Sequence, residues 1–381
     1  MADSLVELYD KQGQSPWLDF IRRNMLHDGG LRRYVEEGGI RGVTANPTIF
    51  AQAIGAGDDY DAQIAELSKQ GVAPHDMFEA IALDDIRAAA DILRPVYDAG
   101  GNDGFVSIEV SPEKAFQTQP TIDEAKRWWS LIDRPNLMVK IPATNEGIPA
   151  IEECTAAGLN INITLIFAIE FYERVMEAYI RGIERRVATG QDVRTSNSVA
   201  SFFVSRVDTA VDKQLDAKIA AATSDTDRQH LESLLGKAAV ANAKIAYERF
   251  QAVFGSERFK KLQAAGAQVQ RPLWASTGTK NKAYSDILYI QELIGPDTVN
   301  TMPPATIDAF RDHGVARRTI DEGIPAAHKV MTDLAAAGVA IDQVTADLQR
   351  DGVEAFTKSF SEIAATAEKK ASVLKTKAGA A

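Results

Sequence analysis

Several features are scarce in this sequence, and each scarcity excludes a class of protein. The 381 residues include one cysteine, Cys154, so no intramolecular disulfide can form, and its setting AIEECTAAG indicates a packed helix rather than a nucleophile's pocket. No uninterrupted apolar stretch is long enough to span a bilayer, and the acidic start MADSLVELYDKQGQSPW has no apolar core of the signal-peptide type. We therefore expect a cytoplasmic protein with no membrane partner.

Basic residues are also in deficit. The chain has 42 lysines and arginines against 53 aspartates and glutamates, which gives a net charge of −11. A general nucleic-acid binder usually has a strong basic excess, so we expect no nucleic-acid partner, and any anionic ligand has to be met by a few well-placed cations. The five histidines are scattered, and no pair has a metal-ligand spacing near a carboxylate at a strand end. We therefore expect no catalytic metal.

What is present is an ordinary globular composition, with 45% hydrophobic and 25% charged residues. Eight short apolar runs bounded by turn signals alternate with helix-like segments such as TIDEAKRWWSLI. The runs cover residues 15–21, 39–45, 104–111, 136–143, 159–167, 198–205, 271–278 and 298–304. This alternation predicts an α/β fold, a (β/α)8 TIM barrel with additional helices.

The length beyond a minimal barrel has to be placed in additions to a single domain over residues 1–381. Helical insertions fit residues 51–99 and 207–264, and a C-terminal helical extension fits roughly 323–376. The alternative is a two-domain, doubly wound fold, but no strand is followed by the Gly-rich fingerprint of a dinucleotide site.

The run LMVKIPAT carries a lysine, Lys140, inside an otherwise uncharged strand. Because side chains alternate faces along a strand, Lys140 lies opposite the apolar face of Val139 and Ile141. The same division of the other strands puts polar residues on one face, which we expect to line the barrel mouth: Asp19, Asn46, Glu109, Asn162 and Ser276. Taken singly, each of these is explained by polar groups satisfying one another inside the barrel. Together they favour a functional site.

An amine in a strand interior has a characteristic chemistry. Burial favours its neutral, nucleophilic form, and the natural reaction is a Schiff base with a ketone or aldehyde. The resulting iminium withdraws electrons and allows the neighbouring carbon–carbon bond to break or form. Such a reaction needs carboxylates as proton carriers, and Asp19 and Glu109 are available.

Two segments indicate an anionic substrate. The loop WASTGTKN (274–281) follows the seventh strand, where barrels often bind phosphate, and it carries Lys280. Arg206 follows the sixth strand in SFFVSR and could offer a forked donor. For each cation the alternative is an ordinary solvated charge.

Five motifs carry a resemblance to a known family: TANPTIF (44–50), SIEVSP (107–112), MVKIPAT (138–144), INITLIF (161–167) and SFFVSRVD (201–208). Together, and in this order, they are highly specific. The chain resembles transaldolases over nearly all its length, and the longer chain with WASTGTKN resembles a bacterial subgroup. The resemblance implies transfer of a dihydroxyacetone unit from a ketose phosphate (sedoheptulose 7-phosphate or fructose 6-phosphate) to an aldose phosphate (glyceraldehyde 3-phosphate or erythrose 4-phosphate). The reaction belongs to the pentose phosphate pathway and needs no cofactor.

Residue by residue, the resemblance implies roles at matching positions. Lys140 resembles the Schiff-base lysine, Asp19 the acid–base group for carbon–carbon cleavage, and Glu109 the residue that orients the catalytic water. The residues similar to those holding the dihydroxyacetone portion are Asn46, Asn162, Thr164 and Ser201. Arg206 and Ser276 match phosphate-site positions. Many relatives have an arginine two residues after that serine, whereas this chain has Gly278, and we expect Lys280 to replace it.

Two rival functions remain at this point. An aldolase that releases free dihydroxyacetone, or that catalyses a deoxyribose-phosphate type of reaction, would share the Schiff base. The related fructose-6-phosphate aldolases, however, commonly have glutamine where this chain has Glu109. A silent phosphosugar-binding protein would gain nothing from a desolvated amine and would be more stable without it. We therefore favour the transferase, with sugar phosphates as its small-molecule partners and a homo-oligomer left open.

Overall fold

The protein folds around a closed barrel of parallel strands, as seen in a computed structural model that describes residues 4–100 and 102–379. The strands are β1 Gln14–Leu18, β2 Gly42–Thr44, β3 Phe105–Glu109, β4 Leu137–Pro142, β5 Ile161–Ile166, β6 Ser198–Phe203, β7 Arg271–Ala275 and β8 Thr298–Met302. They follow one another around the barrel in sequence order, and β8 pairs with β1 to close it. The prediction of a (β/α)8 barrel is confirmed.

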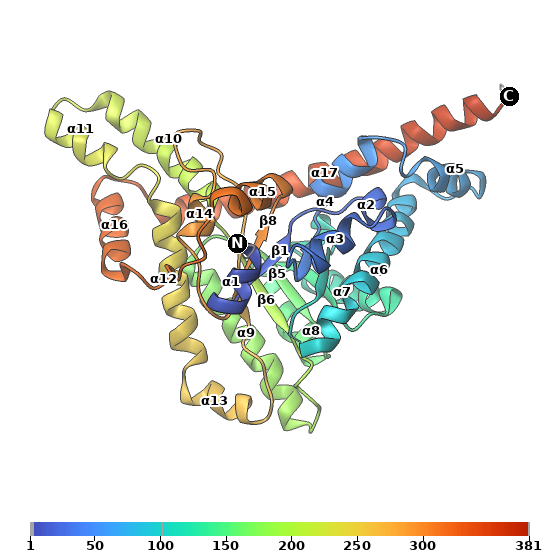
Figure 1. The fold of residues 1–381 in the computed structure, drawn as a ribbon, viewed down its shortest axis with the longest axis horizontal. Helices are drawn as coiled ribbons and strands as arrows, with labels where there is room; N and C mark the ends of the chain where they lie inside the picture. The colour runs from blue at the N-terminus through green and yellow to red at the C-terminus, as the bar shows by residue number, and fades with distance from the viewer. Residues whose placement is uncertain (1–3, 101, 380–381) are drawn as a thin grey trace.

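Helices surround the barrel and extend well beyond it (Figure 1). Those in the first half are α1 Ser4–Gln12, α2 Arg23–His27, α3 Gly30–Glu36, α4 Pro47–Gly55, α5 Asp61–Lys69, α6 Pro74–Gly100, the short η1 Pro112–Lys114, α7 Thr118–Ile132, α8 Gly147–Ala156 and α9 Ile169–Ala188. The second half has α10 Ser205–Ala221, α11 Asp225–Glu232, α12 Ala238–Phe254, α13 Glu257–Ala264, α14 Leu288–Gln291, α15 Pro304–His313, α16 Ile324–Ala336 and α17 Ile341–Gly379. None of the described helices is long and apolar enough to cross a membrane.

The register of neighbouring strands fixes which residues share a level in the barrel. Glu109 on β3 lies beside Lys140 on β4, and Lys140 in turn lies beside Asn162 on β5. The strands are buried on both faces because helices cover the outside and side chains fill the inside, as parallel sheets require. The register therefore brings three polar residues, distant in sequence, into one row.

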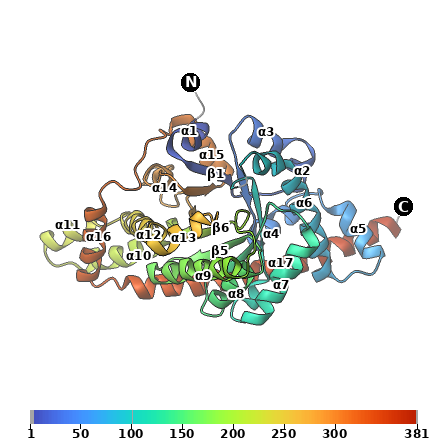
Figure 2. The ribbon, with the colours of Figure 1, turned by 90° about the horizontal axis from the view of Figure 1, so that it is seen from below.

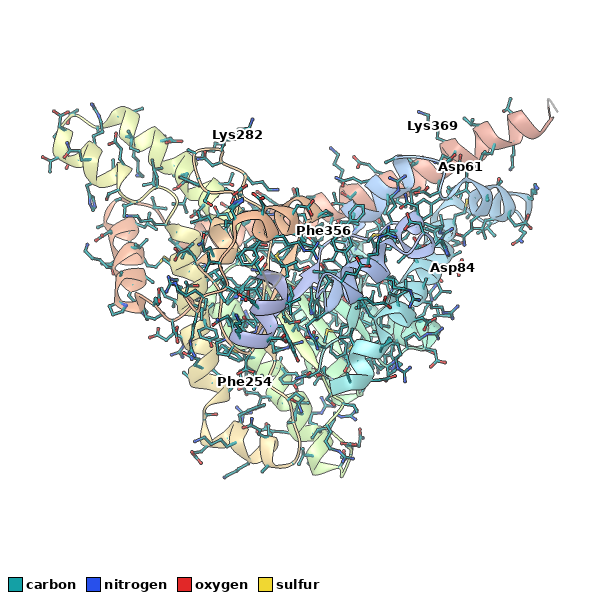
Figure 3. All side chains as sticks on the ribbon, viewed as in Figure 1. Asp61, Asp84, Phe254, Lys282, Phe356 and Lys369 are labelled. Atoms are coloured by element: carbon teal, nitrogen blue, oxygen red, sulfur yellow. The ribbon has the colours of Figure 1, made fainter. Side chains whose placement is uncertain are left out.

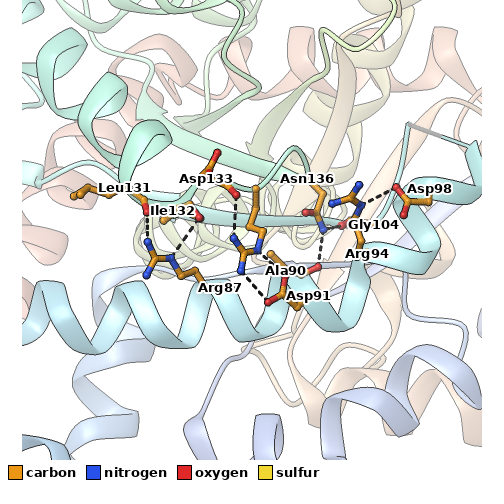
Figure 4. Close-up of polar contacts among 11 residues, drawn as sticks. Arg87, Ala90, Asp91, Arg94, Asp98, Gly104, Leu131, Ile132, Asp133 and Asn136 are labelled. Atoms are coloured by element: carbon orange, nitrogen blue, oxygen red, sulfur yellow. Dashed lines mark hydrogen bonds and ion pairs between the residues drawn. The ribbon is translucent and has the colours of Figure 1, made fainter.

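Helix α6 is attached to the barrel by polar contacts, which Figure 4 shows together. The Asn136 side chain, just before β4, donates from Nδ2 to the carbonyls of Ala90 and Gly104 at 2.9 and 2.8 Å. The Arg87 guanidinium donates to the carbonyls that end α7. These bonds satisfy buried backbone groups and align α6 with the strands that carry Glu109 and Lys140.

Helix α17 is the longest addition, and it crosses the molecule to end beyond α5 (Figures 1 and 2). The Gln349 amide on α17 donates to the carbonyls of Ala143 and Leu165, at the ends of β4 and β5, at 2.8 and 3.3 Å. Farther along, Lys370 forms an ion pair with Asp61 of α5 at 2.6 Å. Phe356, labelled in Figure 3, lies among the packed side chains at the centre of the molecule. The helix therefore covers the carboxyl ends of the strands.

The opposite end of the barrel is closed by a buried carboxylate, Asp103. Its oxygens accept hydrogen bonds from the Ser15 hydroxyl at 2.6 Å and from the Trp17 indole at 2.9 Å. Arg41 at 2.9 Å and Arg271 at 3.5 Å supply the compensating positive charge. Side chains on β1 and β7, and one just before β2, thus meet at a single carboxylate.

Candidate active site

Lys140 lies deep in the mouth of the barrel and is 5% exposed. Its Nζ donates a hydrogen bond to the Ala45 carbonyl at 3.3 Å and forms an ion pair with Glu109 Oε2 at 3.4 Å. The alternation of apolar residues in β4 explains the placement, because Val139 and Ile141 face the helices and leave Lys140 inside.

Glu109 lies next to this amine with its oxygens poorly satisfied. Neither carboxylate oxygen has a hydrogen-bond partner among the described residues, although Lys140 is within ion-pair distance. Burial raises the pKa of Glu109 above its ordinary value, and the charges of Lys140 and Arg206 oppose this rise. A buried carboxyl with free lone pairs and a raised pKa can exchange protons through a water molecule.

Asp19 reaches the same pocket from the end of β1. Its backbone N–H donates to the Met302 carbonyl at 2.8 Å, and its Oδ1 accepts a hydrogen bond from the Thr44 hydroxyl at 2.6 Å. The loss of water around the carboxylate raises the pKa of Asp19. The Thr44 hydrogen bond and, to a smaller extent, the charge of Lys140 lower it. The carboxyl is therefore held in one orientation and titrates above an ordinary aspartate.

The polar residues of β5 and β6 divide into those engaged with protein and those facing the pocket. Asn162 is fully buried: its Nδ2 donates to Ser107 Oγ at 3.0 Å, and its Oδ1 accepts from Ser201 Oγ at 2.7 Å. Thr164 lines the pocket, and its buried hydroxyl has no partner among the described residues. Thr164 thus has a hydrogen bond to give to a ligand, whereas the Asn162 amide is already oriented by two serines.

Asn46 has a structural role that the sequence patterns did not reveal. It is the N-cap of α4, and its Oδ1 accepts a hydrogen bond from the Ile49 N–H at 3.0 Å. This bond fixes the amide, and Asn46 still lines the pocket. One residue therefore caps the helix and forms part of the pocket wall.

The far end of the pocket carries the cations. Arg206 lies in the first turn of α10, and its guanidinium carbon lies 5.1 Å from the centre of the Phe203 ring. Ser276 follows β7 with a φ of 57°, and its hydroxyl lies 3.0 Å from that of Ser205. Lys280 lines the same pocket, as does Gly278.

The seventh strand departs from the predicted alternation. Ala275 lines the pocket, and so does its neighbour Ser276. Strict alternation would put consecutive residues on opposite faces, so the expected division of this strand is wrong at its end. The physical reason is the left-handed backbone at Ser276, which turns its side chain back toward the mouth.

The pocket that these residues enclose has a volume of about 430 Å³, in the range of small-molecule sites. Its wall includes most of the residues predicted from the sequence: Asp19, Asn46, Lys140, Thr164, Ser201, Arg206, Ser276 and Lys280. Glu109 and Asn162 lie behind that wall, beside Lys140. Over the described part of the chain, no three His, Cys, Asp or Glu side chains are grouped to hold a metal ion.

Sequence patterns missed several residues of the wall. Thr44, which orients Asp19, lies on the polar face of its strand and could have been included on that ground. Phe203 and Phe356 are apolar and carried no such signal. Phe356 in particular comes from α17, and only the tertiary packing of that helix brings it to the mouth.

The carboxyl end of this closed parallel barrel holds a buried lysine, two carboxylates and two cations. This arrangement defines a barrel enzyme that acts on a small anionic substrate. The profile of the Transaldolase/Fructose-6-phosphate aldolase family matches residues 16–367, and the chain belongs to this family. The resemblance noted in the motifs is thereby confirmed.

Relatives narrow the function within the family. The transaldolase of Saccharopolyspora erythraea is 46% identical over 366 residues, which cover 96% of this chain and 97% of the relative. The transaldolase of Thermobifida fusca is 47% identical over 365 residues (95% and 97%), and that of Trichodesmium erythraeum is 43% identical over 373 residues (97% and 98%). With this likeness over nearly the full length, the chain is a transaldolase enzyme of carbohydrate metabolism that acts on sugar phosphates.

Proposed function

We propose that the transferred unit is dihydroxyacetone and that Lys140 carries it as a Schiff base. The Lys140 amine adds to the C2 carbonyl of the ketose phosphate, and loss of water from the carbinolamine gives an iminium. The C3–C4 bond then breaks, its electron pair moves toward the iminium, and an aldose phosphate leaves as the aldehyde. The remaining enamine adds to the aldehyde of the acceptor, and the same steps in reverse release the new ketose phosphate.

Two carboxyl groups carry the protons in this scheme. Asp19 takes the proton of the C4 hydroxyl as the carbon–carbon bond breaks and returns it when the new bond forms. Glu109 orients a water molecule that protonates the carbinolamine hydroxyl as it leaves, and later delivers water to the iminium. The raised pKa of both groups suits these roles, because each can hold or give up a proton nearer neutrality than an exposed carboxyl.

The remaining residues bind different parts of the substrate. Asn46, Asn162, Thr164 and Ser201 hold the dihydroxyacetone portion, with Ser201 also fixing the Asn162 amide. Arg206, Ser276 and Lys280 hold the phosphate, which enters from the cationic end of the pocket. No cofactor takes part, because the lysine iminium itself withdraws the electrons.

We also propose a single domain over residues 1–381 and a cytoplasmic location. The one cysteine, Cys154, is buried and its pKa is raised to about 12 by burial, as suits a packing residue in a reducing compartment. We propose no nucleic-acid or membrane partner for this acidic chain. Sedimentation equilibrium would show whether a homo-oligomer forms.

The observation that carries the mechanism is the buried ion pair of Lys140 and Glu109 at 3.4 Å inside the pocket. Borohydride reduction in the presence of fructose 6-phosphate, followed by peptide mass spectrometry, tests it. We expect a three-carbon adduct confined to Lys140. An aldose phosphate added before the borohydride should discharge the adduct quickly, and water alone should discharge it slowly. The Lys140→Arg variant is the matched control and should form no adduct. An enzyme that turns over without any adduct on Lys140 would overturn the Schiff base.

A further inference from the structure

Helix α10 presents two aspartates, one turn apart, to the loop that carries Lys280. Asp208 and Asp212 are 1% and 9% exposed, so both carboxylates are largely removed from water. Neither lines the active-site pocket, and neither has a place in the mechanism above. Buried carboxylates are costly unless they are hydrogen-bonded, so their partners indicate what they hold.

Each aspartate bridges the same two segments. Asp212 Oδ2 accepts the Tyr284 hydroxyl at 2.7 Å, and its Oδ1 accepts the Gly236 N–H at 3.0 Å. Asp208 repeats the arrangement with the Tyr289 hydroxyl at 2.9 Å and the Ala239 N–H at 2.7 Å. The tyrosines belong to the segment after β7, and the N–H donors belong to the approach to α12 and its first turn.

The ring of Tyr284 packs closely against Gly236. Gly236 has a φ of 68°, and a Cβ placed on it would come within 2.7 Å of the Tyr284 ring carbon Cζ. Glycine therefore serves here both for its backbone conformation and for the close approach of the ring. The ring position and the hydroxyl bond together fix Tyr284 in one place.

The loop connects Tyr284 to Lys280 through a compact turn. The Thr279 hydroxyl donates to the Ser285 carbonyl at 2.8 Å, and the Tyr284 N–H donates to the Asn281 carbonyl at 3.1 Å. Lys280 lies between these bonds in the chain, whereas Lys282 extends to the upper edge of the molecule (Figure 3). A shift of Tyr284 must therefore shift the backbone that carries Lys280.

A second cavity, of about 320 Å³, adjoins the active-site pocket at Lys280. Asp208, Asp212, Tyr284 and Tyr289 form part of its wall, and Lys280 lines both cavities. The Lys280 side chain thus stands between an acidic recess and the cationic end of the substrate pocket. Its reach toward a phosphate depends on where the loop backbone is held.

We propose that Tyr284 and Asp212 are positioning residues that hold the Lys280 segment over the phosphate end of the pocket. Tyr289 and Asp208 anchor the following residues of the same segment to α10. Because Arg206 lies in the first turn of α10, the helix ties both cations to one rigid element. This inference rests on the proposed role of Lys280, and it adds the residues that set the affinity for the phosphate group.

The test compares acceptors with and without phosphate. At saturating sedoheptulose 7-phosphate, the Michaelis constant is measured for glyceraldehyde 3-phosphate and for unphosphorylated glyceraldehyde in Tyr284→Phe, Lys280→Ala and the double variant. We expect Tyr284→Phe to raise KM for glyceraldehyde 3-phosphate about 5-fold, because one hydrogen bond is lost. The kcat and the KM for glyceraldehyde should stay within about 2-fold, and the double variant should match Lys280→Ala.

The matched control is Tyr247→Phe, which removes a tyrosine hydroxyl bonded to the Pro296 carbonyl at 3.1 Å, away from the loop. It should leave both KM values unchanged, and melting temperatures of all variants separate local from global loss of structure. If Lys280→Ala leaves KM unchanged, the phosphate role of Lys280 fails and this inference fails with it. If Lys280→Ala raises KM but Tyr284→Phe does not, or if the two effects simply add, only the positioning role is overturned.

Discussion

Asp19 and Glu109 share the pocket with Lys140, whose charge acts on the pKa of both carboxyl groups. Burial raises the pKa of both carboxyls, and the lysine between them lowers both. All three were found from the sequence because a charge inside an apolar strand is unusual and because side chains alternate along strands. Thr44, the hydrogen-bond donor to Asp19, was not among the predicted site residues. Its place on the polar face of its strand is a weak signal, because hydroxyl side chains on strands are common.

Thr44 provides a pH test at the scale of one residue. Its hydroxyl donates to Asp19 and favours the ionised carboxylate, so Thr44→Val should raise the pKa of Asp19 further. At a given acidic pH less Asp19 is then ionised, and the acidic limb of kcat/KM should move to higher pH by about one unit, since a hydrogen bond to a charged group is worth about 1.5 kcal/mol.

The pH profile of kcat/KM is the measurement, and Thr44→Ser, which keeps the donor, is the control. Well above the acidic limb the variant and the parent enzyme should be equally active. A limb that stays in place in Thr44→Val would show that Asp19 does not control it.

At the scale of elements, the local patterns located helices but not their partners. The sequence indicates helix over roughly 323–376, and the structure has α16 and then α17 in that region. What brings α17 to the mouth is a set of contacts between distant parts of the chain. Gln349 bonds to Ala143 and Leu165, and Thr48 bonds to Ser359 at 2.8 Å. Periodicity describes one helix face and cannot name the surface that the face will meet.

The covering role of α17 predicts a change in reaction partition. Phe356 is 3% exposed and lines the pocket, so Phe356→Leu should admit water to the iminium and enamine on Lys140. We expect release of free dihydroxyacetone to rise several-fold relative to transfer, with a stability loss of about 1 kcal/mol. A coupled assay for dihydroxyacetone alongside the transfer assay measures the ratio.

Phe360→Leu is the control for this experiment. Phe360 lies one turn farther along α17 and packs on Phe78 with ring centres 5.4 Å apart. Its replacement should cost similar stability and leave the ratio of release to transfer unchanged. An equal change of that ratio in both variants would contradict a covering role for Phe356 itself.

At the scale of the whole molecule, the two ends of the barrel have different tasks. The carboxyl end carries the pocket, and the amino end carries Asp103 with Arg41 and Arg271. Asp103→Ala would leave two partly buried arginines without their carboxylate. The Ser15 hydroxyl and the Trp17 indole would each lose a hydrogen-bond acceptor. We expect the free energy of unfolding to fall by about 3 kcal/mol, while kcat and KM stay unchanged where the variant is folded.

Chemical denaturation and steady-state kinetics on the same preparation measure both quantities. Asp98→Ala is the control, since Asp98 pairs with Arg94 on the exposed face of α6 (Figure 4) and should cost less than about 0.5 kcal/mol. A loss of activity in folded Asp103→Ala would contradict the division of tasks between the two ends.

The pairing of β1 with β8 affects the order in which the barrel can form during translation. Gln14 pairs with Thr298 and Leu18 with Met302, so the seam joins an early and a late part of the chain. A ribosome delivers β1 long before β8, and α17 follows later still. During most of translation the edge of β1 that later pairs with β8 has no partner strand. In the same period α17 does not yet cover the strand ends around Lys140. Of the described helices, the last to leave the ribosome is therefore the one that covers the strand ends around Lys140.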